Sequence, residues 1–198
     1  MAATQGFAVL SLDGSSKEWN VAGVADRSDD VALVQQAIDA AQATGCVDSL
    51  QTVLVGFGRG GHLAAVVACG DTSRIAGLVM IRGPYLPPGC APTKTLPVLI
   101  EADTTDAVAP FDGGWGSSSP SDPTYTPTGL DATRDGWAEL NQCDPSSVAT
   151  TEPTGVVVAT RGTCAAGSFV VSRVSTGFGH AWPTDITPAL SELIENAT

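Results

Sequence analysis

Residues 51–69, QTVLVGFGRGGHLAAVVAC, join an apolar run of strand type to an apolar run of helical type through a turn dense in glycine. The run Val53, Leu54 and Val55 precedes the turn, and the alanine- and valine-rich stretch 63–68 follows it. A strand, a glycine turn and a helix within about nineteen residues form the βα unit at whose junction α/β proteins place their ligands. The glycine turn, residues 56–61, is therefore the first candidate for a functional site.

Two motifs overlap in the glycine turn, and they predict different functions. The nucleophile elbow G-x-S-x-G has Gly56 and Gly60 in place but has Gly58 where serine is required. The dinucleotide motif G-x-G-x-x-G is matched fully by Gly56, Gly58 and Gly61, and Arg82 after the next predicted strand would suit a 2′-phosphate. A plain tight turn that needs positive φ at Gly58 is a third explanation. The local pattern leaves all three open.

The composition predicts one folded domain covering residues 1–198, with 43% hydrophobic residues and a mean hydropathy of +0.15. A formal net charge of −12 argues against nucleic acid and anionic membranes as partners. No apolar run reaches the length of about eighteen residues that a membrane span needs.

The chain has five cysteines, with no Cys-x-x-Cys or Cys/His cluster, so we expect no metal site. Five cysteines in an acidic chain rich in Ser, Thr, Gly and Pro favour a secreted protein over a cytosolic one, although the chain begins without a signal peptide. Because the number is odd, we expect at least one thiol to be free or to bridge to another chain.

Hydrophobic periodicity predicts an alternation of strands and helices along the chain. We expect strands at 6–13, 53–55, 75–81, 96–101, 155–160 and 168–174, and helices at 30–44, 63–68, 132–140 and 188–196. This alternation predicts an α/β fold, with a mostly parallel sheet and helices on both faces. Residues 111–129, dense in Gly, Ser and Pro, are expected to form a surface loop or a lid over a site.

Polar residues that follow two of the predicted strands point to a particular chemistry. Asp103 and Asp106 follow the strand at 96–101, and His180 follows the strand at 168–174. Ligands of parallel α/β sheets bind at the carboxyl ends of the strands. The order of nucleophile position, acid and histidine is that of the α/β-hydrolase triad, whereas a dinucleotide site has no use for either residue.

With these segments the chain resembles the α/β-hydrolase esterases that include polyhydroxybutyrate depolymerase-like and feruloyl esterase-like proteins. The resemblance covers most of the chain, from GFAVLSLDG through DDVALVQQAID, VLVGFGRGGHLA and PVLIEADTTDAVAPFDGG to WAELNQC and GFGHAWP. It implies an α/β-hydrolase-type sheet, carboxylic ester hydrolysis without a cofactor, and an ester-type small-molecule or polymer ligand.

The resemblance also implies roles for individual residues. Asp106 corresponds to the acid of the triad, with Asp103 as a rival, and His180 corresponds to the histidine. The Arg59 backbone N–H would donate to the oxyanion. We expect His62 to be an ordinary helical histidine.

Other implied roles concern the surroundings of the site. Trp182 and Phe111 flank it and would contact an acyl group, packing under a loop being the alternative. Cys143 and Cys164 match a disulfide of the family.

The chain departs from the family at two points. Gly58 has no side chain with which to attack an ester, and the family's first strands have no counterpart, which would leave an open sheet edge. A partner chain or self-association would cover that edge, unless the sheet is a smaller stable form. We therefore expect an esterase scaffold that is catalytically impaired. The alternatives are a non-catalytic binding or structural protein, and a dinucleotide-binding domain that uses Gly56, Gly58 and Gly61.

Overall fold

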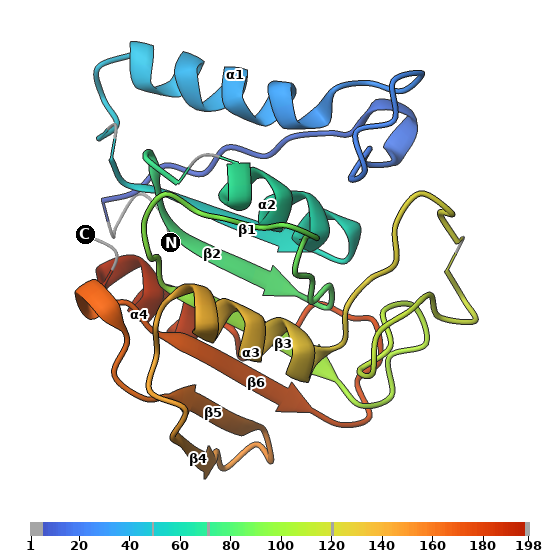
Figure 1. Ribbon diagram of the computed structural model, residues 1–198, viewed down its shortest axis with the longest axis vertical. Helices are drawn as coiled ribbons and strands as arrows, with labels where there is room; N and C mark the ends of the chain where they lie inside the picture. The colour runs from blue at the N-terminus through green and yellow to red at the C-terminus, as the bar shows by residue number, and fades with distance from the viewer. Residues whose placement is uncertain (1–5, 49, 71, 120, 197–198) are drawn as a thin grey trace.

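The structure is a computed structural model that describes residues 6–48, 50–70, 72–119 and 121–196 (Figure 1). The described helices and strands are, in chain order, η2 (Ser15–Lys17), α1 (Asp30–Ala43), β1 (Thr52–Phe57), α2 (Arg59–Gly70), β2 (Ile75–Ile81), β3 (Val98–Asp103), α3 (Leu130–Leu140), β4 (Ser147–Thr151), β5 (Val157–Arg161), η3 (Ala165–Gly167), β6 (Val170–Ser175) and α4 (Thr187–Asn196).

The six strands form one sheet in the order β1-β2-β3-β6-β5-β4. The first four strands in this order pair in parallel, and β5 and β4 continue the sheet in antiparallel orientation. All residues of β2 and β3 are buried, as expected for parallel strands covered on both faces. The predicted α/β fold with a mostly parallel sheet is confirmed.

Helices cover both faces of the sheet (Figure 1). The larger core cluster joins α2 and α3 to the sheet through Leu63, Val67 and Trp137, and α1 packs outside α2. On the opposite face, Ile186 and Leu193 of the α4 region pack against the strands. Asp29 begins α1, because its side chain accepts a hydrogen bond from the backbone N–H of Ala32 at 2.9 Å.

The prediction of a strand at residues 6–13 is wrong. This segment is irregular, and Val9 and Leu10 are 71% and 60% exposed. An apolar run becomes a strand only when a neighbouring strand pairs with it, and no described strand of the sheet pairs with these residues. The periodicity in the sequence contains no information about that neighbour.

The sheet ends in β4 on one side and in β1 on the other. Strand β4, which the sequence analysis did not predict, forms an antiparallel hairpin with β5 around Gly155. At the other margin, β1 is the end strand and pairs with β2 alone among the described strands, and Val55 on it is 47% exposed.

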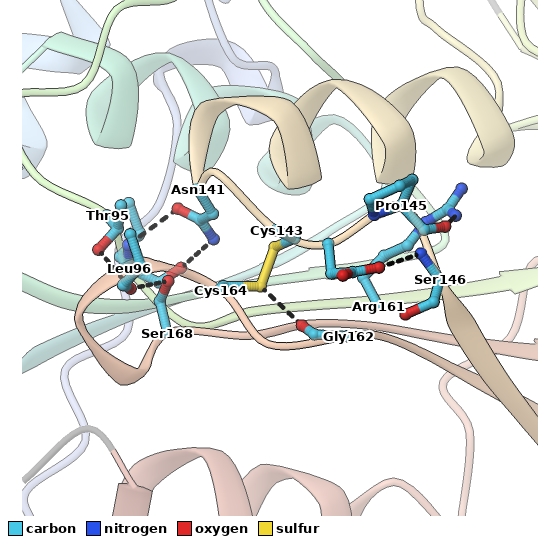
Figure 2. The surroundings of a disulfide bond; sticks show 12 residues. Thr95, Leu96, Asn141, Cys143, Pro145, Ser146, Arg161, Gly162, Cys164 and Ser168 are labelled. Atoms are coloured by element: carbon cyan, nitrogen blue, oxygen red, sulfur yellow. Dashed lines mark hydrogen bonds between the residues drawn. A yellow bond between two sulfur atoms is a disulfide. The ribbon is translucent and has the colours of Figure 1, made fainter.

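Two disulfides brace the sheet and its helices. One joins Cys143 to Cys164, the pair implied by the resemblance, and the other joins Cys69 at the end of α2 to Cys90. Cys46 is a free, exposed thiol, as the odd number of cysteines led us to expect. Figure 2 shows that Asn141 lies beside the Cys143–Cys164 bond and faces Leu96.

The Asn141 side chain accepts a hydrogen bond from Leu96 N at 3.1 Å and donates one to Leu96 O at 2.8 Å. Because Asn141 is the C-cap residue of α3 and Leu96 lies just before β3, these bonds fix the end of α3 against the sheet.

Candidate functional site

The glycine turn connects β1 directly to α2. Gly58 has a φ of +54°, a conformation that glycine adopts without strain. Its N–H donates to Ile81 O at 2.8 Å, and its carbonyl accepts from Gly61 N at 2.9 Å. These bonds tie the turn to the end of β2 and to the first turn of α2.

The glycines of the turn are required for different reasons. A Cβ atom on Gly56 would lie 2.1 Å from Gly60 O, and one on Gly61 would lie 2.8 Å from Gly83 O. These two glycines therefore allow the close approach of backbone to backbone. A Cβ atom on Gly58 would instead face a side chain, at 3.0 Å from Nε2 and 3.3 Å from Cε1 of His180.

His180 is paired with Asp106 on the side away from the turn. Its Nδ1 lies 2.8 Å from Asp106 Oδ2, and the Asp106 side chain is fully buried. The other carboxylate oxygen, Oδ1, accepts from the backbone N–H groups of Val108 and Ala109 at 2.8 and 2.9 Å. With Asp106 ionised, Nδ1 donates and Nε2 presents its lone pair toward Gly58.

Asp103, the rival acid, has a different role. Its carboxylate accepts from the backbone N–H groups of Phe178 and Gly179 at 3.1 and 3.2 Å and from the Ser175 hydroxyl at 2.8 Å. Burial alone would raise the pKa of Asp103, but hydrogen bonds from Thr105, Ser175 and Phe178 hold it well below its usual range. Asp103 therefore anchors the histidine loop, residues 176–183, just before His180.

Arg82 anchors the same loop just after His180. It is fully buried, and its Nε donates to Ala181 O at 3.2 Å. The guanidinium lies 3.7 Å from Glu101 Oε1 and 3.8 Å from Asp103 Oδ2. Burial raises the pKa of Glu101 to about 7, although Arg82 and Arg173 oppose the shift. Because Arg82 is enclosed by these carboxylates, it is not exposed to a ligand phosphate.

The aromatic residues near His180 are only partly those predicted. The Phe57 ring lies 4.7 Å from the His180 ring and 5.9 Å from the Trp182 ring, between centroids. Trp182 is 51% exposed and Phe178 is 63% exposed. Phe111 packs against the larger core cluster. The sequence analysis did not single out Phe57 or Phe178, although both lie within the two segments that carry the motifs.

The loop at 111–129 contains no helix or strand in its described part, apart from a single bridge between Gly113 and Thr128. It packs on the first turn of α2, where Trp115 lies under the Arg59 guanidinium at 4.8 Å and Tyr125 Oη lies 3.0 Å from His62 Nδ1. Asp122 forms an ion pair with Arg27 at 2.7 Å. The loop therefore covers α2 beside the glycine turn.

His62 lies within this aromatic cluster and is buried, in line with a packed helical histidine. Burial lowers its pKa to about 3, and the charges of Arg59 and His180 add to the effect. It is thus neutral at physiological pH, and its Nε2 has no hydrogen-bond partner within the described residues.

Other classes of site receive no support from the described residues. They contain no group of three or more His, Cys, Asp or Glu side chains placed to hold a metal ion. Nor does the described part of the chain include a helix long and apolar enough to cross a membrane. A cavity of about 190 Å³ lies near Ile75, Lys94 and Ser168, at the amino ends of the strands and away from Gly58 and His180.

Comparison with known proteins gives one informative similarity. No protein-family model matches the chain. It is 27% identical over 203 residues to a protein of Nocardia uniformis subsp. tsuyamanensis described as "Putative esterase NocK", a match that covers 92% of this chain. The chain spans 58% of the length of that relative. Together with the observed sheet, this distant similarity supports an esterase-like hydrolase scaffold.

Proposed function

We propose that the protein is a carboxylic ester hydrolase scaffold whose serine-dependent cycle is interrupted at Gly58. One observation carries the proposal: His180 Nε2 lies 3.0 Å from the place of a Cβ atom on Gly58. In a serine hydrolase that place belongs to the nucleophile, and the histidine acts first as its base and then as an acid. Here Asp106 orients the histidine, but glycine supplies no hydroxyl for it to deprotonate.

The remaining parts of the proposed site are assigned from the same comparison with a serine hydrolase. Arg59 is the first residue of α2, and backbone N–H groups at a helix N-terminus are suited to stabilise an oxyanion. Trp182 and Phe57 would border an ester-type small-molecule or polymer ligand. The two disulfides support an oxidising, extracellular location.

A non-catalytic binding protein is the second candidate, and two observations favour it. Position 58 carries no side chain, and among the described strands β1 pairs with β2 alone, so that a partner strand could pair with its other side. The dinucleotide alternative has less support, because His180 faces Gly58 and Arg82 is buried against Glu101 and Asp103.

The test is ester hydrolysis by Gly58→Ser, with Gly58→Ala as the matched control. Both variants carry the cost of a side chain at positive φ, about 1–2 kcal/mol, and both require His180 to yield by a few tenths of an ångström. We expect Gly58→Ser to hydrolyse p-nitrophenyl esters at least about 100-fold faster than Gly58→Ala. A folded Gly58→Ser with no gain would refute the assignment of the nucleophile position. The assignment would also be refuted if the unsubstituted protein hydrolysed the same esters as fast as Gly58→Ser.

A further inference from the structure

We infer that His180 and Asp106 activate a water molecule in place of a serine hydroxyl, so that the chain as given hydrolyses activated carboxylic esters directly, without an acyl-enzyme. This inference rests on the proposed function, because it uses the same base and the same position at Gly58. It adds an activity that the interrupted serine cycle does not supply.

The Nε2 atom of His180 carries the first step of the argument. It forms no hydrogen bond within the described residues, and it is not among their buried side-chain atoms that lack a partner. Part of its surface is therefore open to solvent. Because Gly58 has no side chain, the turn supplies no hydroxyl that would compete with water for this atom.

Solvent reaches the base but not the acid. The His180 side chain is 20% exposed, whereas the Asp106 side chain is fully buried. Both oxygens of Asp106 are engaged, Oδ2 by His180 and Oδ1 by two backbone N–H groups. Water can therefore donate a hydrogen bond to Nε2, while Asp106 keeps Nδ1 as a hydrogen-bond donor.

The position of the base is fixed from both sides along the chain. Asp103 holds the backbone N–H groups of Phe178 and Gly179, and Arg82 holds the carbonyl of Ala181. His180 lies between these anchors, and its ring packs against Phe57. A base held in this way loses little conformational entropy when water and ester bind. This pre-organisation favours general-base catalysis.

The reaction involves only water and the ester. The water oxygen bonds to the acyl carbonyl carbon as Nε2 takes one of its protons, which gives a tetrahedral oxyanion and an imidazolium. The oxyanion then collapses and the bond to the leaving oxygen breaks. The leaving oxygen takes the proton from the imidazolium and departs as the alcohol, the carboxylic acid is released, and the free base is restored.

The test compares the chain as given with His180→Gln and Asp106→Asn, using p-nitrophenyl acetate. A positioned general base contributes about 10²–10⁴-fold, so we expect kcat/KM to fall at least about 100-fold in His180→Gln. The Cys46→Ser variant removes the free, exposed thiol, which could itself transfer an acyl group. We expect this variant to keep full activity. Thermal unfolding of each variant establishes that the comparison is between folded proteins.

Two results would overturn the inference. One is a folded His180→Gln that hydrolyses the ester as fast as the unsubstituted protein. The other is an acyl group on His180 detected by mass spectrometry during turnover of the Cys46→Ser variant. If Gly58→Ser gains activity while the chain as given equals His180→Gln, the inference fails and the proposed function stands. If the chain as given depends on His180 but Gly58→Ser gains nothing, the water mechanism stands and the assignment of the nucleophile position fails.

Discussion

The Nε2 atom of His180 lies 3.0 Å from the position that a Cβ atom on Gly58 would occupy. This relationship joins the turn after β1 to the loop after β6, which are far apart in the sequence. It places an imidazole that is paired with Asp106 over the position that our proposal assigns to the nucleophile of an α/β-hydrolase.

Asp103, the last residue of β3, and Asp106, three residues later, are predicted to behave differently in the Gly58→Ser background. Asp106→Asn should lower kcat by about 10³–10⁴-fold with little change in KM, because the amide favours the wrong tautomer of His180. The measurement is steady-state kinetics on a p-nitrophenyl ester. Asp103→Asn should act mainly through the position of the histidine loop, with a loss of stability. An Asp106→Asn variant as active as its Gly58→Ser parent would contradict the pairing.

Arg82 is predicted to be essential for stability. Arg82→Met would leave Glu101 and Asp103 buried without this cation, which should cost about 3–5 kcal/mol of unfolding free energy in urea. The matched change on the surface is Arg74→Met, which removes an ion pair with the exposed Asp39 and should cost less than about 1 kcal/mol. Equal losses for the two variants would contradict the cost that we assign to removing Arg82 from the buried network.

His62 is predicted to make stability depend on pH. Its pKa is lowered to about 3 in the folded state from 6.5, so the unfolded state binds the extra proton between these values. Stability should therefore fall as pH decreases below about 6.5, with a slope of up to about 1.4 kcal/mol per pH unit from this group. His62→Asn removes the titration and offers an amide to Tyr125.

The measurement for His62 is urea unfolding of both proteins at pH 6.5 and pH 4.5. Glu101, whose pKa is raised to about 7, acts in the opposite direction over this range, because the folded state binds its proton more tightly. Comparison with His62→Asn cancels that contribution, since both proteins retain Glu101. Parallel pH profiles for the two proteins would show that His62 is not held neutral.

The two disulfides are predicted to contribute similarly to stability. Each closes a loop with a sequence separation of 21, for which loop entropy predicts about 3 kcal/mol. Replacing Cys143 and Cys164 together by serine, or Cys69 and Cys90 together, should lower the unfolding free energy by about that amount. Peptide mapping without reduction should give these two pairs and an alkylated Cys46. A disulfide that includes Cys46 would contradict the observed pairing.

Much of the arrangement of the candidate site could be predicted from the sequence, because its motifs lie at the ends of strands. The glycine turn, Asp106 and His180 each follow a strand predicted close to its observed place, and parallel strands bring such residues to one edge. The resemblance favoured Asp106 over Asp103, but the spacing of the two residues could not decide between them. The choice depends on which carboxylate reaches Nδ1, a matter of loop geometry over three residues.

The anchoring residues could not be predicted for a related reason. Arg82 and Asp103 act through backbone groups of the histidine loop, and those contacts join separate strands. Similarly, the apolar pattern at 6–13 predicted a strand, but pairing with a neighbour decides whether a strand forms, and that information is not local.

The most direct test of the central claim is covalent labelling of position 58. A fluorophosphonate reacts with a hydroxyl only when a base activates it, so Gly58→Ser should gain the mass of one phosphonyl group at that residue. The same label should be lost in Gly58→Ser with His180→Gln. The chain as given and Gly58→Ala should remain unlabelled at this position. A folded Gly58→Ser protein that stays unlabelled, or one that is labelled equally without His180, would contradict the account.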